Sequence, residues 1–298
     1  MNPRRSHLTV AWTLALAAWL WPAFGHAQPA CDDPHPLRMA LIPKSQAQQP
    51  RSQLAPLLRV LERSTQRRVE LSLPSSYGAV IEGLLAGTVD VAELGPASYA
   101  MLMARAETVQ VFAALAARDG TLPDQPGRYH ALLLTNRDTG LDSVAQLQGK
   151  RVSLTDPAST SGALLPRAGM RQLTGRTLEQ HFARVSYAGS HDRALQALRR
   201  GLVDAAFVSS TRLNEALQQG HLKSDDVVEL WRSPPVPTDP FVLRKRLCAP
   251  LQARIREAFL GHQAELAPMF QQLGSGAFVA ADDADYRAVR DLLRQALP

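Results

Sequence analysis

The chain has 298 residues, of which 45% are hydrophobic and 20% charged, with 18 Gly and 21 Pro. This composition is typical of a folded globular protein, and it excludes an extended disordered chain and a collagen-like repeat. The formal charge is +6, but no stripe of basic residues with interleaved aromatics occurs, so we expect no nucleic-acid partner.

The N-terminus has the pattern of a secretory signal peptide. Arg4 and Arg5 precede an apolar run over residues 8–20, and Gly25-His26-Ala27 is a cleavage site with small residues. The alternative is a membrane anchor, but the run is shorter than the roughly 20 residues that a span needs. We therefore expect residues 1–27 to be removed, with cleavage near Ala27, and the rest of the chain to be periplasmic.

Cys31 and Cys248 are the only cysteines. Export brings them to an oxidising compartment, where a disulfide can persist, but the sequence alone does not decide whether they pair. Two isolated cysteines do not make a metal-binding pattern, and no cofactor motif is present, so the sequence predicts neither a metal nor a cofactor.

Short apolar strands alternate with amphipathic helices after the signal. The expected strands cover residues 37–42, 69–73, 89–91, 130–135, 151–154, 184–187 and 204–208. The expected helices cover residues 54–61, 80–85, 96–104, 161–173, 190–200, 209–218, 251–259 and 286–297. This order predicts an α/β fold in which mainly parallel sheets are flanked by helices.

The chain is expected to form two lobes of similar size. Residues 231–240 are too rich in proline for a helix or a central strand, and they are expected to connect the lobes. The first lobe then comprises residues 28–127 and 236–298, and the second comprises residues 128–235. Ligands of such sheets bind in the crevice at the carboxyl ends of the strands.

One strand-to-helix junction is rich in hydroxyl groups. The segment Asp156-Pro-Ala-Ser-Thr-Ser-Gly162 brings Ser159, Thr160 and Ser161 to the start of a helix. Hydroxyls and unpaired backbone N–H groups at the positive end of a helix dipole can bind an anion. The alternative is an ordinary helix cap that faces solvent.

Similar junctions follow other predicted strands. Ser190 and His191 begin a helix after Gly189, and His191 could donate to an oxyanion and change its affinity between pH 5 and 8. In the first lobe, Tyr77 and Tyr99 also lie at junctions between a strand and a helix. Tyrosines at such places are more often packed in the core, but four junctions with hydroxyl donors favour a binding site.

Four segments together resemble the phosphate, phosphite and phosphonate family of periplasmic substrate-binding proteins of ABC transporters. They are Gly95-Pro96 with Tyr99, residues 156–162, residues 187–192 and residues 237–240. The resemblance implies a monomeric two-lobed clamshell of the type II-like periplasmic-binding class. It would close over a small tetrahedral phosphorus oxyanion and deliver it to an ABC permease. The ligand-binding residues that it implies are Tyr77, Tyr99, Ser159, Thr160, Ser161, Ser190 and His191.

Two acidic residues bear on the kind of ligand. An aminoalkylphosphonate would need a carboxylate for its ammonium group, because an unpaired cation in a closed cleft is costly. Asp239, in the expected connection between the lobes, is the candidate, and Glu93 is either a second acid or a group that repels the anion. The sequence does not decide between inorganic and organic phosphorus ligands.

Other functions were weighed against transport. A periplasmic subunit that senses an oxyanion and signals to a membrane kinase would have the same fold. A hydrolase is disfavoured because no Gly-x-Ser-x-Gly motif occurs and Gly149-Lys150 is not part of a phosphate-binding loop. We therefore expect a binding protein and not an enzyme.

Overall fold

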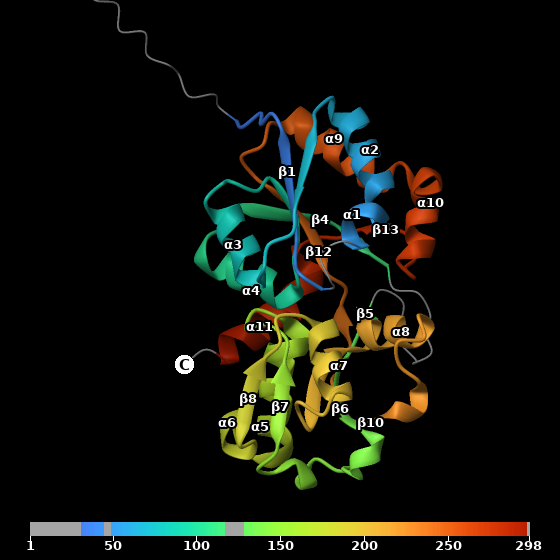
Figure 1. Cartoon of the computed structure of the whole chain (residues 1–298). Helices are drawn as coiled ribbons and strands as arrows, with labels where there is room; N and C mark the ends of the chain where they lie inside the picture. The colour runs from blue at the N-terminus through green and yellow to red at the C-terminus, as the bar shows by residue number, and fades with distance from the viewer. Residues whose placement is uncertain (1–30, 45–48, 117–127, 297–298) are drawn as a thin grey trace, which may run out of the picture. The chain divides into compact units, whose positions relative to one another are not determined.

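Two β-sheets organise residues 31–44, 49–116 and 128–296, which are the residues that this computed structural model describes (Figure 1). The first sheet has six strands in the order β13-β4-β12-β3-β1-β2. Its strands are β1 (Leu37–Leu41), β2 (Val69–Ser72), β3 (Val91–Glu93), β4 (Val109–Leu115), β12 (Pro240–Arg244) and β13 (Phe278–Ala280). Strands β2, β1 and β3 are parallel, whereas β12 pairs antiparallel with both β3 and β4.

The second sheet has five strands in the order β10-β6-β9-β7-β8. They are β6 (Ala131–Asn136), β7 (Arg151–Leu154), β8 (Arg184–Tyr187), β9 (Ala205–Ser209) and β10 (Val227–Arg232). Strands β8, β7 and β9 are parallel, and β6 pairs antiparallel with β9 and β10. Each sheet therefore has a parallel part that is extended by antiparallel strands, and β4, β10, β12 and β13 were not expected from the sequence.

Helices cover both faces of each sheet. Those of the first sheet are α1 (Gln49–Gln53), α2 (Ala55–Thr65), α3 (Tyr77–Leu85), α4 (Pro96–Arg105), α9 (Ala249–Leu260), α10 (Gln263–Gln272) and α11 (Arg287–Ala296). Those of the second are the π-turn η3 (Thr160–Leu164), α5 (Leu165–Thr174), α6 (Leu178–His181), α7 (His191–Arg199) and α8 (Ser210–Gln218). Single 3-10 turns are η1 (Arg137–Thr139), η2 (Ala145–Leu147), η4 (Ser224–Asp226) and η5 (Asp283–Tyr286).

Apolar side chains alternate between the two faces of the central strands. In β6, Leu132 and Leu134 pack with α7 and α8, whereas Leu133 packs on the opposite face with Met170 of α5. A strand that is buried on both faces reads as a continuous apolar run, which is why β6 could be predicted. The two-lobed α/β architecture is confirmed.

A short two-stranded ribbon joins the halves of the molecule. Strand β5 (Arg128–Tyr129) pairs antiparallel with β11 (Val236–Pro237), so both crossings of the chain lie side by side. Tyr129 and Val236 of this ribbon pack with Leu164 of η3 and with Val289 of α11. Residues 233–239 run from β10 to β12 through this ribbon, and Pro240, which was expected to belong to the connection, begins a central strand, which proline permits at the first position.

A disulfide between Cys31 and Cys248 ties the start of the described chain to α9, with a Cα–Cα distance of 4.9 Å. It closes a loop with a sequence separation of 217 residues. In the chain-entropy model, a loop of that length stabilises the folded state by about 5 kcal/mol. The disulfide lies beside a buried ion-pair cluster, in which Arg244 contacts both Asp32 and Asp90.

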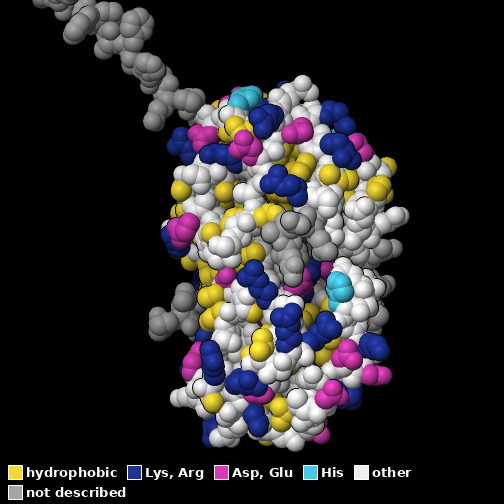
Figure 2. All heavy atoms as spheres, viewed as in Figure 1, with side chains coloured by type: hydrophobic (Ala, Val, Ile, Leu, Met, Phe, Trp, Pro, Cys, Tyr) yellow, Lys and Arg dark blue, Asp and Glu magenta, His cyan; other side chains and the backbone are white. Residues whose placement is uncertain are grey.

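The surface and the N-terminus add two observations. On the face drawn in Figure 2, Lys and Arg side chains are mixed with Asp and Glu over both halves of the molecule. Across the described residues, no helix has the length and apolar character that crossing a membrane requires. The signal peptide expected over residues 1–27, with its cleavage site near Ala27, lies outside the described residues.

Candidate functional site

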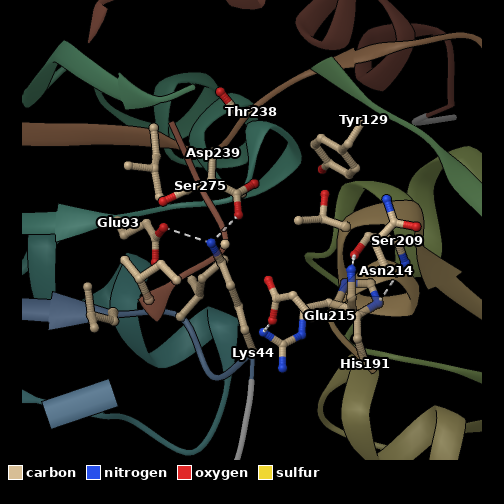
Figure 3. A pocket seen from close by; sticks show the side chains of 18 of the residues that line it. Lys44, Glu93, Tyr129, His191, Ser209, Asn214, Glu215, Thr238, Asp239 and Ser275 are labelled. Carbon is tan, nitrogen blue, oxygen red and sulfur yellow. Dashed lines mark hydrogen bonds and ion pairs between the residues drawn. The ribbon is translucent and has the colours of Figure 1, made fainter. Parts of the chain in front are cut away.

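A cavity of about 310 Å³ lies between the two sheets and is lined by both (Figure 3). From the first sheet and its helices, the polar lining includes Lys44, Tyr77, Glu93 and Asp239, together with Gly95. Those from the second sheet, its helices and the ribbon are Tyr129, Ser159, Thr160, Ser161, His191, Ser209, Arg212 and Glu215. Most of the hydroxyl groups predicted from separate sequence segments therefore meet in one place.

The hydroxyl cradle, defined as Ser159, Thr160 and Ser161, is formed where β7 leads into η3. The three residues are 2%, 1% and 1% exposed, and the Ser159 hydroxyl accepts a hydrogen bond from the Gly162 N–H at 3.1 Å. Gly162 is required here, because a Cβ atom at this position would lie 1.5 Å from Thr155 Oγ1. The cradle opens into a π-turn, a distortion that is common at functional sites.

Three hydrogen bonds cross between the halves of the molecule next to the cradle. The Ala97 N–H donates to Thr160 Oγ1 at 2.8 Å, and the Ser98 hydroxyl donates to the Ala158 carbonyl at 2.8 Å. The Tyr77 N–H donates to the Asp156 carboxylate at 3.2 Å. Each bond joins α3 or α4 to the segment after β7, so these bonds hold the two halves together beside the cradle.

His191 is held in one tautomer by the backbone. It is 5% exposed, and its Nδ1 accepts a hydrogen bond from the Ser209 N–H at 3.1 Å, so the neutral ring carries its proton on Nε2. Burial, followed by the charges of Arg212 and Lys44, lowers the pKa of His191 to about 3. His191 is therefore a neutral hydrogen-bond donor near neutral pH. The sequence suggested that it would titrate between pH 5 and 8, but its pKa lies below that range.

The opposite wall of the cavity carries charges (Figure 3). Lys44 Nζ lies 2.7 Å from Glu93 Oε1 and 2.6 Å from Asp239 Oδ2. Burial alone would lower the pKa of Lys44, but the charges of Asp239 and Glu93 raise it well above its usual value. Burial also raises the pKa of Glu93, an effect that the charge of Lys44 opposes.

A second ion-pair group lies at the start of α8. Arg212 contacts Asp192 at 2.8 Å and also pairs with Glu215. Burial raises the pKa of Glu215, although Arg212 and Lys44 oppose this. Among the described residues that line the cavity, Lys44 and Arg212 are the only lysine and arginine, and each is neutralised by two carboxylates. The neutral donors are therefore left as the groups that can bind an anion.

Comparisons with known proteins agree with this arrangement. The family model of periplasmic substrate-binding proteins of phosphonate ABC transporters matches residues 39–286. The chain belongs to this family. Membership makes it a periplasmic substrate-binding protein of the phosphonate ABC-transporter type.

Two curated relatives show how far the similarity extends. The phosphonates-binding periplasmic protein of Escherichia coli is 30% identical over 263 residues, which are 86% of this chain and 75% of that protein. A phosphate-import protein of Mycolicibacterium smegmatis is 29% identical over 208 residues, which are 67% of this chain and 63% of that protein. The match thus spans less than two thirds of the second relative.

Solved structures have the same fold. A binding protein component of a phosphonate ABC transporter from Pseudomonas aeruginosa aligns with a TM-score of 0.78 and 25% identity, over 88% of this chain and 86% of that one. A Prochlorococcus marinus protein in complex with methylphosphonate aligns with a TM-score of 0.77 and 17% identity, over 89% and 99%. The second likeness concerns the fold alone.

The structure brings together most of the residues that the sequence singled out in this phosphonate-family protein. Tyr77, the hydroxyl cradle, His191 and Asp239 line the cavity, whereas Tyr99 and Ser190 do not. The Tyr99 hydroxyl donates to Asp283 at 2.6 Å, and its ring packs edge-on against Tyr286. The Ser190 hydroxyl caps α7 by accepting from the Arg193 N–H.

Several residues of the site were missed by sequence reasoning, among them Tyr129, Lys44 and Arg212. Burial and the nearby Asp239 charge raise the pKa of the Tyr129 hydroxyl well above its usual value, although its hydrogen bonds with Thr160 and Ser161 oppose this. Its position at the crossing between the lobes was the only available signal. Lys44 follows β1 in no recognisable motif, and only the fold places it beside Glu93.

The described residues contain no group of three or more His, Cys, Asp or Glu that could hold a metal ion.

Proposed function

We propose that this protein captures a phosphonate or a closely related phosphorus oxyanion in the cavity between its lobes and presents it to an ABC permease. The observation that carries the proposal is the buried hydroxyl cradle, which faces Tyr77 from the other half of the molecule and is closed over by three hydrogen bonds.

The donor set suits a tetrahedral oxyanion. The hydroxyls of Ser159, Thr160, Ser161 and Tyr77 and the Nε2–H of His191 can all donate to P–O⁻, and the hydroxyls can also accept from P–OH. A site of neutral donors does not require the ligand to be fully ionised. It is therefore suited to the singly protonated form of a phosphonate, and it needs no lysine or arginine on the anion.

The size of the cavity favours an organic substituent on phosphorus. Its volume of about 310 Å³ extends beyond the cradle along apolar side chains that include Leu54, Leu115 and Phe241. These side chains offer no partner to an anion, but they can contact an alkyl group. An organic phosphonate would use both parts of the cavity, whereas bare phosphate would use one.

Capture is proposed to work by hinge closure. The lobes, assigned to residues 28–127 with 236–298 and to residues 128–235, would move about the β5–β11 ribbon. Because the donors come from both lobes, a ligand contacts all of them only in the closed state, and binding shifts the population toward that state. The closed form would then be recognised by the permease. A sensor kinase would read the same closed form, but no contact in the structure favours it.

Three further statements belong to this proposal. The protein acts as a monomer, it is exported with cleavage near Ala27, and it releases its ligand unchanged. The absence of catalysis is supported by His191, whose Nδ1 is occupied by the Ser209 N–H and so has no carboxylate that would orient it as a base.

Calorimetric titration of the exported chain tests the proposal. Methylphosphonate, ethylphosphonate and phosphate would be compared, with sulfate as the control anion, and thermal melts would be run in parallel. The proposal predicts saturable one-to-one binding of a phosphonate and stabilisation that grows with the logarithm of its concentration. Phosphorus NMR after prolonged incubation should show an unchanged ligand. The absence of binding by every phosphorus oxyanion would contradict the proposal.

Calorimetry is preferred to tryptophan fluorescence for a structural reason. Trp231 packs against Phe207, with ring centroids 6.0 Å apart, and it does not line the cavity. Its emission is expected to respond weakly to a ligand.

A further inference from the structure

The lysine on the charged wall occupies a place that is suited to a ligand's ammonium group. Lys44 Nζ lies between two carboxylates, at 2.7 Å from Glu93 and 2.6 Å from Asp239, and all three residues line the cavity (Figure 3). The side chains of Glu93 and Asp239 are only 11% and 19% exposed, so water does little to solvate their charges. The chain thus supplies its own ammonium group to this acidic pair.

A ligand that carried a second ammonium group would meet a site that is already filled. Glu215 on the cavity wall and Asp192 beside it are paired with Arg212, and the Asp156 carboxylate next to the cradle accepts from the Tyr77 and Ala158 N–H groups. The ligand cation would have to displace Lys44 from both carboxylates or stay unpaired near two bound cations. Either outcome is unfavourable, because a buried charge without a partner costs far more than the loss of one ordinary contact.

Among the described residues that line the cavity, Glu215 is the other carboxylate that the charge of Lys44 reaches, and it is already paired with Arg212. Lys44 lies three residues after Leu41, the last residue of β1. Within the described part of the chain, Lys44 forms ion pairs with Glu93 and Asp239. Displacement would leave its charge only the open part of the cavity and solvent, since 28% of its side chain is exposed.

We infer that Lys44 is the residue that sets the ligand class: by filling the acidic pair of Glu93 and Asp239, it admits phosphonates with an uncharged substituent and rejects aminoalkylphosphonates. The inference rests on the proposed function and makes it narrower. It also assigns a use to the acidic residues, which complete an internal ion pair and leave the ligand to the neutral donors.

The test compares two ligands that differ by one amino group. Calorimetric titration with ethylphosphonate and with 2-aminoethylphosphonate gives a ratio of dissociation constants for the wild-type protein. The inference predicts a ratio of roughly 100-fold in favour of ethylphosphonate, the order expected when a buried charge lacks a partner. This comparison needs no variant and so does not depend on how a substitution folds.

Lys44→Met then removes the internal ammonium group and keeps the length of the side chain. Two unpaired carboxylates would now face the cavity, so 2-aminoethylphosphonate should bind about 10-fold more tightly than to the wild type, and ethylphosphonate more weakly. Lys245→Met is the matched control, because Lys245 pairs with the exposed Glu107 at 3.7 Å outside the cavity. It should leave the ratio unchanged. Adding Glu93→Gln and Asp239→Asn to Lys44→Met should abolish the gain.

The outcomes distinguish a failure of the role inferred for Lys44 from a failure of the proposed function. If the wild type binds 2-aminoethylphosphonate as tightly as ethylphosphonate, the inference is wrong while the proposed function stands. If Lys44→Met weakens both ligands equally, Lys44 binds the anion itself, and the inference is likewise wrong. If no phosphorus oxyanion binds at all, the proposed function fails and the inference falls with it.

Discussion

The two walls of the cavity hold their polar groups in different ways. The wall from the second sheet also carries the Arg212–Glu215 ion pair, but its neutral donors, here called the neutral wall, are fixed by the backbone, as in the bonds from the Ser209 N–H to His191 and from the Gly162 N–H to Ser159. On the wall from the first sheet, Lys44, Glu93 and Asp239 satisfy one another by charge. The neutral wall can therefore bind an oxyanion without losing an ion pair, while the charged wall limits what else the ligand carries.

The largest expected effect comes from breaking the backbone of the neutral wall. In Gly162→Ala the new Cβ atom would overlap Thr155 Oγ1, so η3 has to shift and the cradle loses its shape. We expect phosphonate affinity to fall by about 1000-fold, the order of losing two hydrogen bonds to a charged group at about 2 kcal/mol each. The free energy of unfolding should fall by about 2 kcal/mol, as for an overpacked core.

Gly78→Ala is the control, because its Cβ atom would have the Ser76 hydroxyl, at 4.0 Å, as its nearest neighbour. Calorimetry and urea unfolding measure both variants. Wild-type affinity in Gly162→Ala would show that the cradle does not hold the anion.

A smaller loss is expected from removing one donor of the cradle. Ser161→Ala deletes a hydroxyl that is 1% exposed and leaves the backbone in place. A lost hydrogen bond to a charged group costs about 2 kcal/mol, which corresponds to roughly 30-fold in affinity. Ser224→Ala, at an exposed position outside the cavity, is the control. An unchanged dissociation constant in Ser161→Ala would remove this hydroxyl from the binding site.

The pKa of His191 predicts how acid affects the neutral wall. It lies near 3 in the folded protein against 6.5 in the unfolded chain, so the unfolded state binds more protons between these values. Above pH 6.5 His191 is neutral in both states, so it does not change the free energy of unfolding. Below pH 6.5 the free energy of unfolding falls as the pH drops, by at most about 1.4 kcal/mol per pH unit.

Replacing His191 with Gln removes this titration. Between pH 6.5 and 4.5 the wild type should lose about 2 kcal/mol more stability than His191→Gln, as measured by urea unfolding at each pH. Parallel loss in both proteins would mean that the pKa of His191 is close to its ordinary value.

The smallest effect tests closure without touching the cavity. The Ser98 hydroxyl donates across the halves of the molecule to the Ala158 carbonyl at 2.8 Å, and Ser98 does not line the cavity. Ser98→Ala should weaken binding by about 5-fold, since an ordinary hydrogen bond contributes about 1 kcal/mol. Ser186→Ala is the control, because its bond to the Val152 carbonyl stays within one sheet. Equal dissociation constants for Ser98→Ala and Ser186→Ala would show that this bond between the halves does not contribute to ligand binding.

The sequence predicted the neutral wall better than the charged one. A strand that ends in Ser-Thr-Ser before a helix has a local signature, since the junction itself creates the free N–H groups. Lys44 and Tyr129 have no such signature, because each acquires its partners only when distant segments meet. Tyr99 shows the converse limit: it follows the right junction, but its side chain points to Asp283 and away from the cavity.

The same distinction applies to the fold. The parallel strands alternate with helices along the chain, and their apolar runs revealed them. Strand β12 was missed because it returns from the far end of the second sheet to lie between β3 and β4. The pairing of β12 with β3 and β4 joins segments that are far apart in the sequence. The prolines before β12 indicated only that the chain passes between the lobes there.

A crystal structure of the exported protein with ethylphosphonate would test the central claim most directly. The account predicts the phosphonate oxygens within hydrogen-bond distance of Ser161, His191 Nε2 and the Tyr77 hydroxyl, with Lys44 still between Glu93 and Asp239. A phosphonate bound directly by Lys44, or held by residues of one lobe alone, would contradict it.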